Sequence, residues 1–84
     1  MAKLTLVADG RKMRLAREEA DLTVDELVDL LRIRENIDRH PDTIRNVELG
    51  YAQPGLELFN AYARIVGVPR RKLLADENPE KASA

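Results

Sequence analysis

Residues 41–50 read PDTIRNVELG, and this stretch decides the fold because it contains one short helix together with its start and its stop. Pro41 suits the first position of a helix, where its missing N–H is not needed. Ile44 and Val47 fall on one face at helical spacing. The final glycine can adopt the left-handed conformation that ends many helices. The stretch therefore predicts a helix over residues 41–49 with one apolar face.

Two further helices are predicted upstream of this stretch. Asp9 can cap a helix over residues 10–20, and Thr23 with Glu26 has the spacing of a capping box that starts a second helix. Asn36 is suited to a left-handed stop at its end. The apolar positions at helical spacing are Met13, Ala16 and Ala20 in the first helix and Val24, Leu27, Val28 and Leu31 in the second. Both helices therefore present one face to a common core.

Downstream, the pattern predicts a helix from about Leu56 to Val66 and a last short helix around residues 70–75. At the N-terminus, residues 1–8 alternate weakly and favour a short strand or an extended arm. At the C-terminus, residues 76–84 are polar and small, which is typical of a disordered tail. The predicted class is all-α, with five helices.

Composition excludes several classes of protein. The chain has 84 residues, no cysteine and one histidine, so neither a disulfide framework nor a metal site is expected, and no nucleophile–base pair suggests an enzyme. The N-terminus lacks the pattern of a signal peptide, and no apolar run is long enough to cross a membrane. A cytoplasmic protein without cofactor is expected. The net charge of −1 is low for a protein that binds nucleic acid, so the placement of the cations matters.

The order of residues resembles the phage repressor and Cro-like family of helix-turn-helix domains, also called the xenobiotic-response-element family. The residues that carry the resemblance are Leu22-Thr23 with Glu26-Leu27, then 43–50, Pro54, Leu56-Glu57-Leu58, Ala63 to Gly67-Val68, and Leu73-Leu74. The resemblance covers about residues 10–75. It implies a compact lambda-repressor-like DNA-binding domain over residues 9–75 that reads the major groove with the helix at 41–49.

The resemblance also implies which residues contact DNA. The expected base contacts are Pro41, Asp42, Thr43, Arg45 and Asn46. Among them, Asn46 can bind adenine through its amide, whereas Arg45 can reach a guanine edge or a phosphate. Asp42 either accepts from a cytosine amino group or only complements the helix dipole. The expected phosphate contacts are Thr23, Arg34, Arg39, His40, Tyr51 and Gln53.

Arg17 and Glu48 match the positions at which the family typically has a partly buried ion pair. Such a pair would brace the helix at 41–49, because a guanidinium and a carboxylate can bind each other through two parallel hydrogen bonds. The alternative is two unrelated surface charges.

The clearest departure from the family is the segment between the second and third helices. Residues 32–40 contain about six residues more than a tight turn, and Ile33 and Ile37 compete to plug the core there. The longer segment either leaves the fold intact or adds a basic contact to the DNA backbone through Arg32, Arg34 and Arg39.

The function expected from these patterns is a sequence-specific transcriptional regulator, such as a phage or prophage repressor or Cro-like protein, bound to a double-stranded operator. A homodimer is expected because one such domain contacts few base pairs, with Leu4–Val7 and Leu73-Leu74 as the apolar surfaces available for it. The alternative is a protein-interaction module on the same scaffold, such as an antitoxin or an antirepressor.

Overall fold

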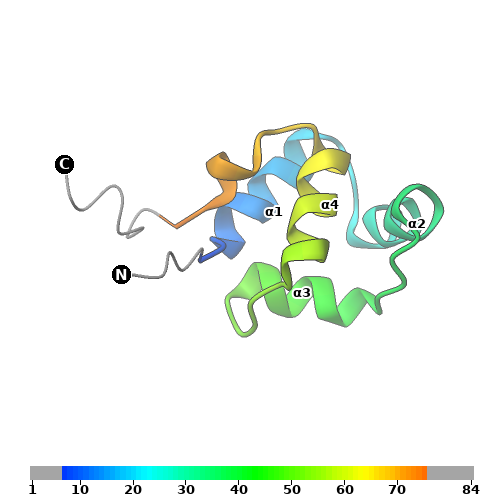
Figure 1. Ribbon diagram of the computed structural model, residues 1–84, viewed down its shortest axis with the longest axis horizontal. Coiled ribbons are helices and arrows are strands. Elements are labelled where there is room, and N and C mark those ends of the chain that lie inside the picture. Colours follow the sequence, from blue (N-terminus) through cyan, green and yellow to red (C-terminus); the bar gives the residue numbers. More distant parts are fainter. Residues whose placement is uncertain (1–6, 76–84) are drawn as a thin grey trace.

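The structure is a computed structural model that describes residues 7–75, and its described part is all-α, as predicted. Its elements are α1 (Gly10–Glu19), α2 (Val24–Glu35), α3 (Pro41–Leu49), α4 (Leu56–Val66) and a short 3-10 helix, η1 (Arg70–Leu73). In Figure 1, α3 lies below α1 and α4, and α2 closes one end of the molecule. The predicted fifth helix is thus a single 3-10 turn.

Side chains satisfy the first amides of three helices. The Asp9 carboxylate accepts from the amides of Arg11 and Lys12 at the start of α1. At the start of α2 the capping box is complete: the Glu26 amide donates to the Thr23 hydroxyl over 3.1 Å, and the Thr23 amide donates to the Glu26 carboxylate over 2.9 Å. These local hydrogen bonds explain why both helices begin where the sequence predicted.

Left-handed residues end three of the helices. Asn36 at the end of α2 has φ of 56°, and Gly50 and Gly67 after α3 and α4 have φ of 86° and 78°. The stops at Asn36 and Gly50 were predicted. A fourth left-handed residue, Asp21, with φ of 60°, turns the chain between α1 and α2 and was not predicted. Aspartate tolerates this conformation better than most residues do.

The core lies where α1, α2 and α4 meet above α3. It comprises Ala8, Met13, Ala16, Leu27, Leu31, Ile37, Ile44, Val47, Leu58, Phe59, Ala61, Tyr62, Ala63, Val66 and Leu73. Through Ile44 and Val47, the inner face of α3 packs against both α1 and α2. One face of α3 is therefore fixed to the body of the domain, while the other is left to solvent.

The segment between α2 and α3 is shorter than residues 32–40, the span that the sequence suggested. The helix continues through Glu35, so Arg32 and Arg34 belong to its last turn, and the connection is residues 36–40. Ile37 is only 4% exposed and plugs the core, whereas Ile33 is 69% exposed. Because Asn36 reverses the chain, the residue after it points inward.

The N-terminal and C-terminal ends of the described segment lie side by side. Ala8 and Leu74 form an isolated antiparallel bridge, in which the Asp9 amide donates to the Leu73 carbonyl and the Ala75 amide donates to the Val7 carbonyl. Most of the predicted arm (1–8) and the predicted tail (76–84) lie outside the described residues. None of the helices in residues 7–75 is both long and apolar enough to span a membrane.

Gly10 is the point of closest approach between α1 and α3. A Cβ atom added there would lie 2.3 Å from the Val47 carbonyl oxygen and 2.5 Å from that of Glu48. Both neighbours are backbone atoms, which cannot move aside as a flexible side chain would. The first turn of α1 can therefore pack on the end of α3 only because residue 10 has no side chain.

We expect Gly10→Ala to destabilise the fold by about 1–3 kcal/mol, because the methyl group must push α3 away from α1. Chemical denaturation measures this change. Gly55→Ala is the matched control, since nothing lies within 4 Å of a Cβ added there. Gly55 is the N-cap of α4, so the loss of a favoured cap and the lower entropy of the unfolded chain offset each other, and the free energy of unfolding should change by less than about 0.5 kcal/mol. Equal stability of Gly10→Ala and wild type would contradict the close approach.

Candidate nucleic-acid interface

A buried ion pair connects α1 to the end of α3. The Arg17 guanidinium donates from Nε to Glu48 Oε2 over 2.8 Å and from Nη2 to Oε1 over 3.0 Å. Both residues are only 8% exposed. The structure thus contains the pair that the family resemblance implied, and it has the bidentate geometry that favours arginine over lysine.

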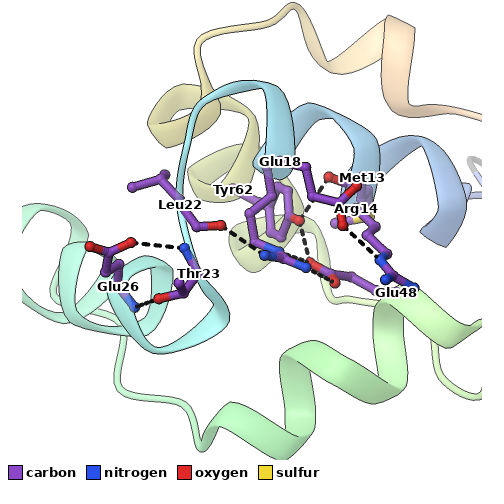
Figure 2. Close-up of polar contacts among 9 residues, drawn as sticks. Met13, Arg14, Glu18, Leu22, Thr23, Glu26, Glu48 and Tyr62 are labelled. Carbon is purple, nitrogen blue, oxygen red and sulfur yellow. Dashed lines mark hydrogen bonds and ion pairs between the residues drawn. The ribbon is translucent and has the colours of Figure 1, made fainter.

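Tyr62 of α4 completes this pair, which we call the Arg17–Glu48–Tyr62 network (Figure 2). Its hydroxyl lies 2.6 Å from Glu48 Oε2 and 2.9 Å from the Met13 carbonyl oxygen. The remaining Arg17 nitrogen, Nη1, donates to the Leu22 carbonyl over 2.8 Å. Among the described residues, no buried side-chain nitrogen or oxygen lacks a hydrogen-bond partner. A buried charge pair stabilises a fold only when its hydrogen bonds are satisfied in this way.

The surroundings shift the pKa of two groups in the network. The hydrogen bond to Glu48 raises the pKa of Arg17, so the guanidinium keeps its charge although burial opposes it. Burial raises the pKa of Tyr62 above its usual range, and the hydrogen bond to the Glu48 carboxylate raises it further. The network therefore holds a cation, an anion and a neutral hydroxyl.

Sequence reasoning missed the role of Tyr62. Tyr62 lies at a buried position of α4, and its ring is fully buried. The hydroxyl of a buried tyrosine, however, usually forms a hydrogen bond, whereas phenylalanine would fill a purely apolar position equally well. That choice of residue was the available signal, but it does not reveal which group accepts the hydrogen bond.

The outer face of α3 carries the residues expected to contact bases. Asp42, Arg45 and Asn46 are exposed, whereas Pro41 and Thr43 are half-buried at the start of the helix. Arg45 Nη1 lies 2.9 Å from Asp42 Oδ1, one helical turn away. Exposed pairs of this kind contribute little to stability, and both side chains of this pair remain accessible to a ligand.

The residues expected to contact phosphates have different surroundings. His40 Nδ1 accepts from the Asp42 amide over 3.0 Å, so the ring caps α3. The Thr23 hydroxyl takes part in the capping box of α2. Arg34, Arg39 and Tyr51 are exposed, and Tyr51 shows 79% of its surface. Arg34 belongs to the last turn of α2, Arg39 to the segment before α3, and Tyr51 to the loop after it.

Gln53 is engaged within the protein. Its Oε1 accepts from the Ala8 amide over 2.9 Å, and its Nε2 donates to the Ala8 carbonyl over 3.2 Å. The carboxamide thus pairs with the Ala8 backbone as a neighbouring strand would, and one N–H of its Nε2 is left over. This pairing, which fixes the loop after α3 to the N-terminal segment, was not predicted.

A cleft of about 230 Å³ lies between α1, the start of α2 and the second half of α3. Its lining residues are Arg14, Arg17, Val24, Arg45, Glu48 and Leu49. Arg14 is paired with Glu18 over 3.1 Å, and the first turn of α2, which lines the cleft through Val24, also carries the acidic residues Asp25 and Glu26. Phosphates that approach the start of α2 would therefore meet negative charge as well as positive charge.

Residues 7–75 offer no set of side chains for a metal. No group of three or more histidine, cysteine, aspartate or glutamate residues in this range is arranged to hold an ion.

Tyr62→Phe should cost about 1–3 kcal/mol at neutral pH, because the Glu48 carboxylate loses a buried donor. The raised pKa of Tyr62 also predicts the pH dependence. The contribution of its protonated hydroxyl is complete below about pH 10 and is lost as the pH rises beyond that value, so Tyr62→Phe should flatten the decline in stability between about pH 10 and about pH 12.

Denaturation at a series of pH values tests this expectation. Tyr51→Phe, at the exposed tyrosine, is the control and should follow the wild-type curve. Parallel curves for Tyr62→Phe and wild type would show that the Tyr62 hydroxyl does not remain protonated in the folded state.

Comparisons of the chain with models of known protein families, with curated proteins and with solved structures find no match.

Proposed function

We propose that the protein is a sequence-specific DNA-binding regulator that reads the major groove with α3. The observation that carries this proposal is the contrast between the two sides of α3. Its inner side is fixed by Ile44, Val47 and the buried Glu48, and its outer side presents Asp42, Arg45 and Asn46 to solvent. A rigidly held helix whose exposed side chains can both donate and accept hydrogen bonds suits the reading of base edges.

The arrangement of α2 and α3 supports the same function. The two helices pack against each other and are joined by residues 36–40, as in a helix-turn-helix unit with a lengthened turn. In such a unit the second helix enters the major groove of DNA, while the first helix lies across the sugar–phosphate backbone. Arg34 on α2 and Arg39 before α3 would then contact phosphates on either side of the groove.

The modest charge favours binding as a homodimer. The whole chain has a net charge of −1, and several of its exposed arginines are paired with acidic side chains, so one copy would bind DNA weakly. Two copies on half-sites about 34 Å apart would roughly double the number of contacts. A repressor or Cro-like protein in the cytoplasm, acting by occupying an operator, is the form of regulator that we propose.

The second candidate is a protein-interaction module such as an antitoxin or an antirepressor. The acidic side chains around the start of α2, among them Glu18, Asp25 and Glu26, favour it. Proteins of the repressor and Cro-like family, which the chain resembles, contact phosphates at this position. The negative charge would weaken such contacts. The two functions differ in whether the isolated protein binds duplex DNA at all.

A salt titration of binding to mixed-sequence duplex DNA tests the proposed function. Each phosphate that the protein neutralises lowers the slope of log K against log salt by about 0.9, so phosphate contacts from Arg34 and Arg39 predict a slope of about −2 per copy. Fluorescence anisotropy between low and physiological salt measures it. If no binding is detected even at low salt, the DNA-binding proposal is wrong and the interaction module is favoured.

Asn46→Ala and Arg39→Ala should affect DNA binding in different ways. Loss of the Asn46 amide should relax the preference at one base pair by about 1–3 kcal/mol, because a bidentate contact to adenine disappears. Loss of Arg39 should weaken binding to all sequences alike. Binding of both variants to a set of single-base operator variants measures the two effects, and a uniform loss for Asn46→Ala would rule it out as a base reader.

A further inference from the structure

Asp42 and Arg45 form a pair on the outer face of α3 in which each side chain remains accessible. Arg45 Nη1 lies 2.9 Å from Asp42 Oδ1, and the two side chains are 52% and 70% exposed. The second carboxylate oxygen, Oδ2, lies 3.7 Å from Nδ1 of His40, the residue that caps the helix. The carboxylate thus lies between the capping histidine and the arginine, at the end of α3 that would enter the groove first.

The contact with Asp42 uses only one nitrogen of the Arg45 guanidinium. An arginine has five N–H donors in a planar fork, so Nε and Nη2 keep an edge with two parallel donors. Without Asp42 the long side chain would sample many rotamers. Held by the carboxylate, it loses less conformational entropy when that edge meets a ligand.

Among the four bases, guanine best matches such an edge. It presents two acceptors, O6 and N7, side by side in the major groove, whereas adenine presents an acceptor next to an amino donor that would face the arginine donors. Asp42 also disfavours the competing role of Arg45 as a phosphate contact, because a phosphate at the guanidinium would be brought close to the carboxylate.

We propose that Asp42 and Arg45 act as one reading unit for guanine, in which Arg45 donates to O6 and N7 and Asp42 holds the guanidinium in position. This inference rests on the proposed DNA-binding function and assigns a base to it. Arg45 contacts the base, whereas Asp42 is a positioning residue that acts through Arg45. The carboxylate lowers the affinity for DNA as a whole and raises the preference for one base.

Selection of bound duplexes from a random pool, followed by binding measurements on the selected site and its single-base variants, tests the proposal. Wild type should require guanine at one position and lose about fivefold to about a hundredfold in affinity when adenine replaces it. Arg45→Gln should shift the preference at that position to adenine, whose N6 and N7 match a glutamine amide. Arg71→Gln removes the same charge from η1 and should leave the preference for guanine unchanged.

Asp42→Asn tests whether Asp42 positions Arg45 for guanine or only forms an ion pair with it. The variant should bind mixed-sequence DNA more tightly, because a negative charge is lost, and should discriminate less between guanine and the other bases. Circular dichroism checks that the overall helical content is retained. Tighter binding with unchanged discrimination would show that Asp42 does not position Arg45, and selected sites that lack the guanine would overturn the assignment while leaving the proposed function intact. Absence of binding to any duplex would overturn both.

Discussion

The charged groups of Arg17 and Glu48 are largely removed from water, and groups from three helices and one loop satisfy their hydrogen bonds. Glu48 belongs to α3, Arg17 to α1 and Tyr62 to α4, and the Leu22 carbonyl comes from the loop before α2. An unsatisfied buried charge costs several kcal/mol, which is a large fraction of the stability of a small domain. The helices can therefore shift relative to one another only at a high energetic cost, and the orientation of α3 depends on this constraint.

The sequence predicted the helices well because their boundaries are set locally. Asp9, the Thr23–Glu26 box, Pro41 and Gly50 act within one turn of the chain, so their effects can be read without knowing the fold. The all-α class follows from the same signals. The last helix was predicted around residues 70–75 but is a 3-10 turn over Arg70–Leu73, because a single turn has almost no periodicity to detect.

Long-range features were harder to predict. Gly10 is required by carbonyl groups of α3, almost forty positions away, and the choice of Ile37 over Ile33 as core residue depends on how Asn36 turns the chain. For the candidate site, the sequence indicated which face of α3 is exposed, but the contact between Asp42 and Arg45 and the pairing of Gln53 with Ala8 emerge only in three dimensions. Exposed charges in particular choose among several partners of similar energy.

The bridge between Ala8 and Leu74 affects how this end of the protein can associate with other chains. A strand edge with free N–H and C=O groups invites pairing with another chain. Here the Gln53 carboxamide covers the Ala8 backbone on one side of the bridge, and the Lys12 ammonium donates to the Leu74 carbonyl on the other over 3.0 Å. Another strand would have to displace Gln53 to pair with Ala8, and that displacement would also free the loop that follows α3. Addition of a strand at this end of the protein would then be coupled to the orientation of α3.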